Sequence, residues 1–168
     1  MSVKFVLDSP ELEAAILSLR IAGPELRKQI YARSRQVIAP EWQGALSDAV
    51  GGNTLAQKVL VDSARVNVGT RGVNLTAAKG SRKLKGGFVP KENFAAVEFG
   101  ATWRDGQVQG RRGTTSYKYT RQLNTGFKHR RRKGYYAYPT GDKFIFRYAS
   151  LWISTVARTL HDAVEGKL

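Results

Sequence analysis

Apolar residues recur at helical spacing in the N-terminal third of the chain. Ser9-Pro10-Glu11 predicts a helix start, because it combines an N-cap hydroxyl, a proline at the first helical position and an acid near the positive end of the helix dipole. Gly23-Pro24 ends this helix and opens a second one. The apolar stripes are Leu12, Ala15, Ile16 and Leu19 in the first helix, and Leu26, Ile30, Val37 and Ile38 in the second.

Pro40 is expected to kink or break the second helix, because proline lacks an N–H donor and crowds the preceding turn. The helical pattern then resumes around Trp42, which we expect to anchor the core, and Gly51-Gly52 closes it. A last helix is predicted after Tyr135–Pro139, with Thr140 or Asp142 near its cap and Gly166 at its end. Its apolar face, expected to pack across a sheet, is Phe144, Tyr148, Leu151, Trp152, Val156 and Leu160.

Between these helical regions the spacing of apolar residues changes to alternation. Residues 58–61 and 65–68 predict a hairpin joined by Asp62-Ser63-Ala64, with Val66 and Val68 on one face. Residues 73–76 are a further candidate strand, and residues 3–7 predict a short strand or an extended arm. Together these elements predict an α+β fold, with N-terminal helices and a C-terminal helix packed on a small, mostly antiparallel sheet.

The stretch Asn93–Ala101 predicts a buried strand that carries a single carboxylate, Glu98, between Val97 and Phe99. Glu98 could be the last polar residue of the strand and face solvent, as most glutamates do. Alternatively it is buried and needs a partner, because an unpaired carboxylate among apolar groups is costly. Gly100 ends the strand, since glycine permits backbone angles closed to other residues.

Positive charge is concentrated in one third of the chain. The sequence has 28 basic and 13 acidic residues, and residues 79–133 hold 15 of the basic and three of the acidic ones. Such clustering indicates a polyanionic neighbour, either nucleic acid or an acidic protein surface. The chain of 168 residues is most simply one domain, 1–168, with extended basic loops at 79–91 and 103–134.

The 103–134 loop interleaves aromatic residues with cations, which favours a functional loop over a purely solvated one. Tyr117 to Leu123 could be a strand that forms only against a partner. The run Lys128–Lys133 has three interpretations: a solvated disordered segment, a site of sliding contacts with DNA phosphates, or a segment that docks on an acidic ring or tube.

No residue pattern indicates catalysis. Glu98 and Asp105 lack a nearby histidine or second acid at ligand spacing, and His129 and His161 are isolated. There is no phosphate-binding loop, dinucleotide fingerprint or serine elbow. There are no cysteines, which excludes disulfides and thiolate metal sites and suits a reducing cytoplasm. We expect no enzyme, cofactor, metal or membrane span, and the N-terminus lacks a signal-peptide layout.

Val97-Glu98-Phe99-Gly100 followed by a small residue resembles the signature of a tailed-phage neck family, the head–tail joining or tail-completion proteins similar to lambda protein Z. Gln43–Val50 resembles the Gly-x-Leu segment that precedes this family's first strand. Tyr138-Pro139 is similar to the aromatic-proline element before its closing helix. The loop from Trp103 to Lys133 departs from the family pattern, because it is longer and more basic.

The resemblance implies a structural virion protein of the siphophage head–tail junction, made in the host cytoplasm. It would form a closed ring, expected to be a hexamer, that joins the capsid connector to the tail tube, surrounds non-specifically bound DNA, and contacts the adjacent connector or stopper and terminator proteins. Alternatives are a tail terminator ring, or a free non-sequence-specific nucleic-acid-binding protein.

Intersubunit or loop-anchoring contacts are expected at Glu98, Phe99, Trp103, Tyr117 and Tyr119. Contacts with DNA or an acidic partner are expected at Arg111, Arg112, Lys128, Arg130, Arg131, Arg132 and Lys133.

Overall fold

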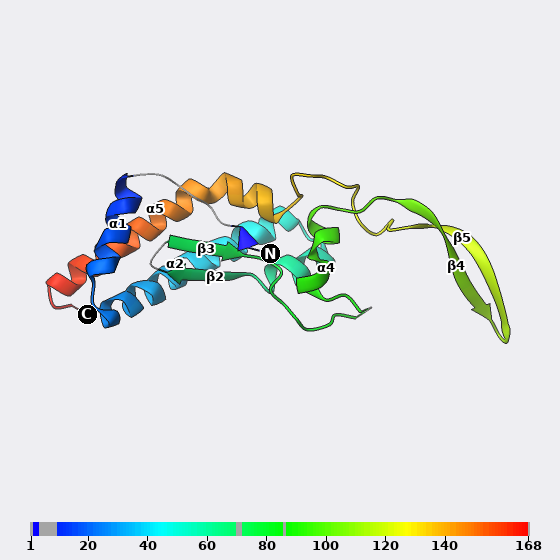
Figure 1. Cartoon of the computed structure of the whole chain (residues 1–168), viewed down its shortest axis with the longest axis horizontal. Helices are drawn as coiled ribbons and strands as arrows, with labels where there is room; N and C mark the ends of the chain where they lie inside the picture. Colours follow the sequence, from blue (N-terminus) through cyan, green and yellow to red (C-terminus); the bar gives the residue numbers. More distant parts are fainter. Residues whose placement is uncertain (1, 4–9, 70–71, 86, 168) are drawn as a thin grey trace.

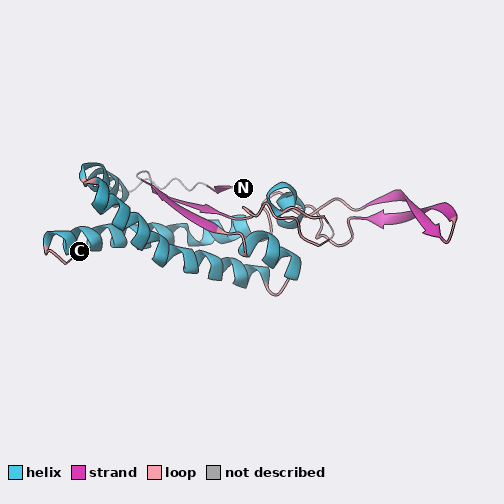
Figure 2. Ribbon diagram, turned by 90° about the horizontal axis from the view of Figure 1, so that it is seen from below, coloured by secondary structure: helices cyan, strands magenta, loops and turns pink. Residues whose placement is uncertain are grey.

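Two long helices, α2 (Pro24–Val50) and α5 (Ala137–Val164), lie along each other and carry a small antiparallel sheet on one side (Figures 1 and 2). The computed structural model describes residues 2–3, 10–69, 72–85 and 87–167. The other helical elements are α1 (Pro10–Ile21), α3 (Thr54–Ala56), the π-helical η1 (Gln57–Val61) and α4 (Pro90–Glu98). The predicted α+β class is confirmed.

The sheet has the order β1-β3-β2, with both neighbouring pairs antiparallel. Its strands are β1 (Ser2–Val3), β2 (Arg65–Gly69) and β3 (Gly72–Thr76). Val66 lies opposite Leu75, and both side chains are buried toward the helices, so the strand predicted at 73–76 is confirmed. Of the segment predicted at 3–7, only Val3 is described; residues 4–9, including the predicted cap Ser9, lie outside the described residues.

Trp42 anchors the core, as predicted. Its side chain is fully buried, its indole N–H donates to the Thr76 carbonyl at 3.1 Å, and its ring meets that of Tyr148 edge to face at 6.0 Å. A kink or a break was predicted at Pro40; helix α2 runs without interruption through this residue, so a break is excluded. Burial of apolar side chains on both sides of the proline outweighs the loss of one hydrogen bond and the steric cost, about 3 kcal/mol.

Val37 was expected in the buried face of α2 but is 41% exposed. The buried positions recur at every fourth residue, at Ile30, Ser34, Ile38 and Trp42. Since each helical residue is rotated by about 100° from the one before it, Ile38 faces α5 and Val37 points to the outside.

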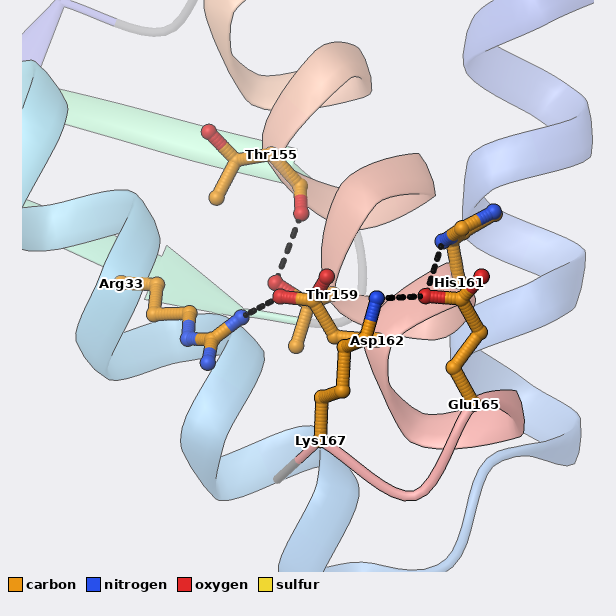
Figure 3. A network of polar contacts seen from close by, with 7 residues as sticks. All are labelled: Arg33, Thr155, Thr159, His161, Asp162, Glu165 and Lys167. Atoms are coloured by element: carbon orange, nitrogen blue, oxygen red, sulfur yellow. Dashed lines mark hydrogen bonds and ion pairs between the residues drawn. The ribbon is translucent and has the colours of Figure 1, made fainter.

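At the ends far from the arm described below, α2 and α5 are joined by an ion pair between Arg33 Nη1 and Asp162 Oδ2 at 2.6 Å (Figure 3). The hydrogen bond from Arg33 holds the pKa of Asp162 below its ordinary value. One turn earlier in α5, Thr159 donates its hydroxyl to the Thr155 carbonyl at 2.8 Å, which satisfies a buried polar group within the helix.

The strand predicted at 58–61 is wrong, because these residues are helical. The Asn53 side chain accepts a hydrogen bond from the Ala56 N–H at 3.0 Å and so starts a helix that continues into η1. In η1 the consecutive residues Val59, Leu60 and Val61 are all buried, which removes the alternation that a half-covered strand would show. The hairpin is instead the β2–β3 pair.

The strand predicted at 93–101 is also wrong, since this segment forms α4 and its C-terminal cap. Pro90 occupies the start of the helix, and Asn93 Oδ1 accepts the N–H of Val89 at 2.9 Å. Phe94, Val97 and Glu98 then face inward at helical spacing. The run of small alanines between them favours a helix over a strand. Helix α4 ends at Glu98, and the chain turns away after Phe99 at Gly100, whose φ is +71°.

The region 103–134, expected as a loop, contains a regular hairpin. Strands β4 (Arg104–Arg112) and β5 (Thr115–Leu123) pair antiparallel over their full length. The strand suggested to form only against a partner is therefore formed within the chain. This hairpin, residues 104–123, is called the arm; it projects away from α2 and α5 (Figures 1 and 2). The other predicted loop, 79–91, has no regular structure among its described residues before α4 begins at Pro90.

Candidate functional site

Glu98, the last residue of α4, is fully buried and binds the first turn of α5. Its Oε1 accepts the backbone N–H groups of Tyr136 at 3.3 Å and Tyr138 at 3.0 Å, and its Oε2 accepts that of Ala137 at 2.9 Å. These amides are the groups that a helix leaves without partners at its N-terminus, where the helix dipole also favours an anion. Glu98 is therefore a cap for a helix that begins far along the chain.

Burial raises the pKa of the Glu98 carboxyl above its ordinary value, and the backbone hydrogen bonds from Ala137, Tyr138, Tyr136 and Tyr135 oppose this rise. The expectation that Glu98 faces solvent is wrong, whereas the need for a partner is met. That partner is a set of backbone amides and not the lysine or arginine of a salt bridge.

Two glycines allow close approaches between the chain segments around Glu98, Gly134 toward Glu98 itself and Gly100 toward the segment 128–129. Gly134 has φ +72°, and a β-carbon there would overlap Glu98 Oε1. Gly100 has φ +71°, and a β-carbon there would lie against the carbonyl groups of Lys128 and His129. Both positions combine a backbone conformation that favours glycine with a contact that leaves no space for a side chain.

The two chain segments that lead into and out of the arm are bonded to each other. The N–H of Ala101 donates to the Lys128 carbonyl at 2.9 Å, and the N–H of Arg131 donates to the Phe99 carbonyl at 2.7 Å. Residues 98–103 together with 124–138 are called the anchor. Through Glu98 the anchor joins the root of the arm to both α4 and α5.

Aromatic rings reinforce the anchor. The ring of Phe99 lies 5.4 Å from that of Tyr138, and the ring of Trp103 lies 4.0 Å from that of His129. Trp103 also donates its indole N–H to the Phe127 carbonyl at 3.0 Å. Glu98, Phe99 and Trp103, all predicted as contact residues, thus lie together at the anchor, where they hold the chain to itself.

The cations of residues 128–133 divide into two groups. Lys128 Nζ lies 4.8 Å and 4.7 Å from the ring centres of Tyr135 and Tyr136, and the Arg131 guanidinium lies 5.5 Å from that of Tyr135. Such contacts stabilise the anchor at its surface, since Lys128 and Arg131 are both exposed. Arg130, Arg132 and Lys133, which form the second group, are exposed as well. Arg130, Arg131 and Arg132 also border an open pocket of about 460 Å³ at the C-terminal end of α4.

Residues directly opposite each other in the register point to the same side of a ribbon. One face of the arm therefore carries all of its apolar side chains, together with three arginines, and is called the apolar face. On the apolar face Val108 lies opposite Tyr119, and the rings of Tyr117 and Tyr119 are 5.7 Å apart. Gly110 lies opposite Tyr117, whose ring covers it so closely that a β-carbon would overlap it, and Leu123 covers Gly106 in the same way. Tyr117 and Tyr119 remain 49% and 39% exposed.

The opposite face of the arm is polar. Gln109 donates from its amide to the Ser116 hydroxyl at 2.7 Å, and Arg111 donates to the Gly113 carbonyl at 3.2 Å near the tip. Arg112, by contrast, lies opposite Thr115 and so belongs to the same face as the tyrosines. The predicted contact residues of the arm therefore separate onto two surfaces.

Comparison with known proteins finds no relative of this chain: no family model, curated protein or solved structure matches it. Within residues 2–3, 10–69, 72–85 and 87–167, no group of three or more His, Cys, Asp or Glu side chains could hold a metal ion. In the same part of the chain no helix has the length and apolar character needed to cross a bilayer.

The structure adds residues to the candidate site that the sequence did not suggest. Gly134 and the amides of residues 136–138 complete the Glu98 contact, and Val108 and Leu123 complete the apolar face of the arm. Alternation in β4 and β5 could have indicated Val108 and Leu123. No local signal in the sequence joins Glu98 to a helix that begins 39 residues later.

Proposed function

We propose that this protein is a structural subunit of the head–tail junction of a tailed phage, where it forms a closed ring that joins the capsid connector to the tail tube around the DNA path. The observation that supports this proposal best is the arm, which extends from the body and leaves Tyr117 and Tyr119 exposed. An isolated two-stranded hairpin is only marginally stable in water, so a long one with an aromatic face is suited to bind a neighbouring protein.

The charge of the arm and anchor fits a position around DNA. Residues 104–133 hold ten basic residues and one acidic residue, Asp105, and Arg130, Arg132 and Lys133 are exposed. Exchangeable contacts between such cations and phosphates would let DNA slide along the ring without sequence recognition. A terminator ring at the tail end of the same junction would use the same features.

Deletion of the gene from the phage genome tests this function. We expect filled heads and separate tails by electron microscopy, restored to joined particles by the intact gene supplied in trans. Antibody against a tag on the C-terminus should label the junction of complemented particles. Joined, infectious particles from the deletion mutant would overturn the proposal. Label on the tail side of the junction would assign the protein to the terminator position.

A second function, free nucleic-acid binding, is favoured by the shape of the arm. A two-stranded ribbon fits the major groove of duplex DNA, and Arg111 and Lys118 lie on the polar face. This function predicts tight DNA binding by the monomer with a steep salt dependence, which the double substitution of Arg111 and Lys118 by alanine would reduce. Weak binding by the monomer together with ring formation would favour the junction protein.

A further inference from the structure

The apolar face of the arm lacks a cover within the described part of its own chain. One side of the ribbon carries Val108, Tyr117, Tyr119 and Leu123. Because the arm points away from α2 and α5, these helices do not cover that side (Figures 1 and 2). Burying this face on another molecule would remove apolar area from water and stabilise the hairpin at the same time.

Charge restricts what can cover this face. The register places Arg104, Arg112 and Arg121 on the same side as the tyrosines. Two arms packed face to face would bring six guanidinium groups together, and like charges in close contact are costly. The cover must therefore offer apolar surface together with carboxylates.

A groove between α2 and α5 has this composition. It is open, has a volume of about 580 Å³, and is lined on its apolar side by Val37, Pro40, Ala45 and Phe144. Gly44 also lines the groove, and a β-carbon there would meet no atom within 4 Å. The exposure of Val37, unexpected for the stripe to which it was assigned, provides apolar surface at this site.

The groove also carries a surplus of negative charge. Glu41 and Asp48 line it with one cation, Arg147, which pairs with Glu41 at 2.9 Å. Among the described residues no ion pair holds Asp48. Three other pockets on the described surface, at the end of α4, at the start of α2 and beside α3, are lined by more cations than carboxylates.

From these two surfaces we infer that the arm of one copy docks into the α2–α5 groove of the next copy, with Tyr117 and Tyr119 against Val37, Pro40 and Phe144, and an arm arginine beside Asp48. The inference rests on the proposed ring. Because the contact joins two different surfaces of the same chain, it is heterologous and can repeat from copy to copy until the ring closes.

Disulfide crosslinking tests the contact, and the chain is suited to it because it has no cysteine of its own. One variant carries Gly44→Cys in the groove. A second carries Thr115→Cys, on the tyrosine face near the tip of the arm, and its matched control carries Ser116→Cys on the opposite face. Each arm variant is mixed with the groove variant at a concentration that supports ring formation and is then oxidised.

We expect about tenfold more crosslinked dimer from Thr115→Cys than from Ser116→Cys, because a disulfide requires β-carbons within about 4 Å of each other. Asp48→Arg should lower ring formation, and Arg112→Glu in the same chain should restore part of it. Rings with equal or no crosslinking from the two arm variants would overturn the docking inference and leave the proposed function standing. Chains that neither assemble nor crosslink would overturn both.

Duplex DNA added to the mixture distinguishes the two molecules that could bind the tyrosine face of the arm, the neighbouring copy and nucleic acid. If DNA at low salt abolishes the Thr115→Cys crosslink and protects the tyrosine face, this face binds nucleic acid and the docking inference is wrong. If the crosslink persists, the arm is occupied by the neighbouring copy as proposed.

Discussion

Glu98 Oε2 accepts a hydrogen bond from the backbone N–H of Ala137 at 2.9 Å, which joins the last residue of α4 to the first residue of α5. Both branches of the arm leave the body beside this contact, since the Ala101 and Arg131 backbone bonds bridge them nearby. A buried carboxylate thus takes part, with these backbone bonds, in joining the root of the arm to the core.

Removal of this carboxylate should destabilise the protein, and the loss should depend on the residue that replaces Glu98. Glu98→Ala leaves three amides without their acceptor and opens a cavity, and should lower the free energy of unfolding by about 3 kcal/mol. Glu98→Gln keeps one acceptor oxygen but turns an NH₂ group toward an amide donor, and should cost about 1 kcal/mol. Urea denaturation measures both. Glu92→Gln on the exposed side of the same helix is the control, expected within about 0.5 kcal/mol of wild type.

The Glu98 contact should also depend on pH. Because burial raises its folded pKa above 4.5, the folded state holds the proton more tightly than the unfolded state does. The resulting stabilisation is present below pH 4.5 and is lost as the pH rises through the folded pKa. The free-energy difference between wild type and Glu98→Gln should therefore grow as the pH is lowered. A difference that is constant from neutral pH downwards would contradict this.

Gly134→Ala should be more damaging than a glycine substitution elsewhere with a similar backbone angle. Its β-carbon would overlap Glu98 Oε1 in addition to the strain at φ +72°, for a loss of about 3 kcal/mol. Gly113 at the arm tip has φ +59°, and a β-carbon there would meet no atom within 4 Å, so Gly113→Ala should cost only about 1 kcal/mol. Equal losses in thermal or urea unfolding would show that the Glu98 overlap is relieved at no cost.

Tyr148 should be recognisable by its late titration. Burial, and then the charge of Glu41, raise the pKa of its phenol to about 12. The neutral phenol is favoured in the folded state, so this stabilisation is present below pH 10 and is lost as the pH rises through about 12. Ultraviolet absorbance should show a step near pH 12 that Tyr148→Phe removes.

The same substitution should not weaken the fold at neutral pH. The Tyr148 hydroxyl is buried and has no hydrogen-bond partner among the described residues. Its removal relieves a desolvation penalty of about 1 kcal/mol, so Tyr148→Phe should be as stable as wild type or more stable. A clear loss of stability would mean that the hydroxyl has a partner in solution.

Secondary structure was predicted correctly from the sequence where the apolar residues followed a single helical periodicity over a long stretch. The stripes that include Leu19, Trp42 and Trp152 correctly predicted α1, α2 and α5, because burial of an apolar face decides long helices. The predicted secondary structure was wrong where a short apolar run was compatible with both a strand and a helix. Residues 58–61 are helical because Asn53 caps the helix that precedes them. Residues 93–98 are helical because they continue a helix that begins at Pro90.

The candidate site was predictable only in part. Glu98 and the tyrosines of the arm were recognised as contact residues, since an acid among apolar groups and aromatics among cations both indicate partners. The partner of Glu98 could not be predicted, because local patterns carry no information about a contact across 39 residues. The arm was expected as a loop because its glycines hid the alternation; Gly106 and Gly110 lie where the opposite strand supplies the covering side chain.

The order of the arm and α5 in the sequence has a consequence for synthesis on the ribosome, because the arm is made before α5. The arm pairs only residues close in sequence and can form as soon as it emerges. The carboxylate of Glu98, the indole of Trp42 and the guanidinium of Arg33 must each wait for partners or packing from α5. The nascent protein therefore exposes the residues of the arm before its core is complete, and the emergence of α5 both closes the core and supplies the amides that bind Glu98 at the root of the arm.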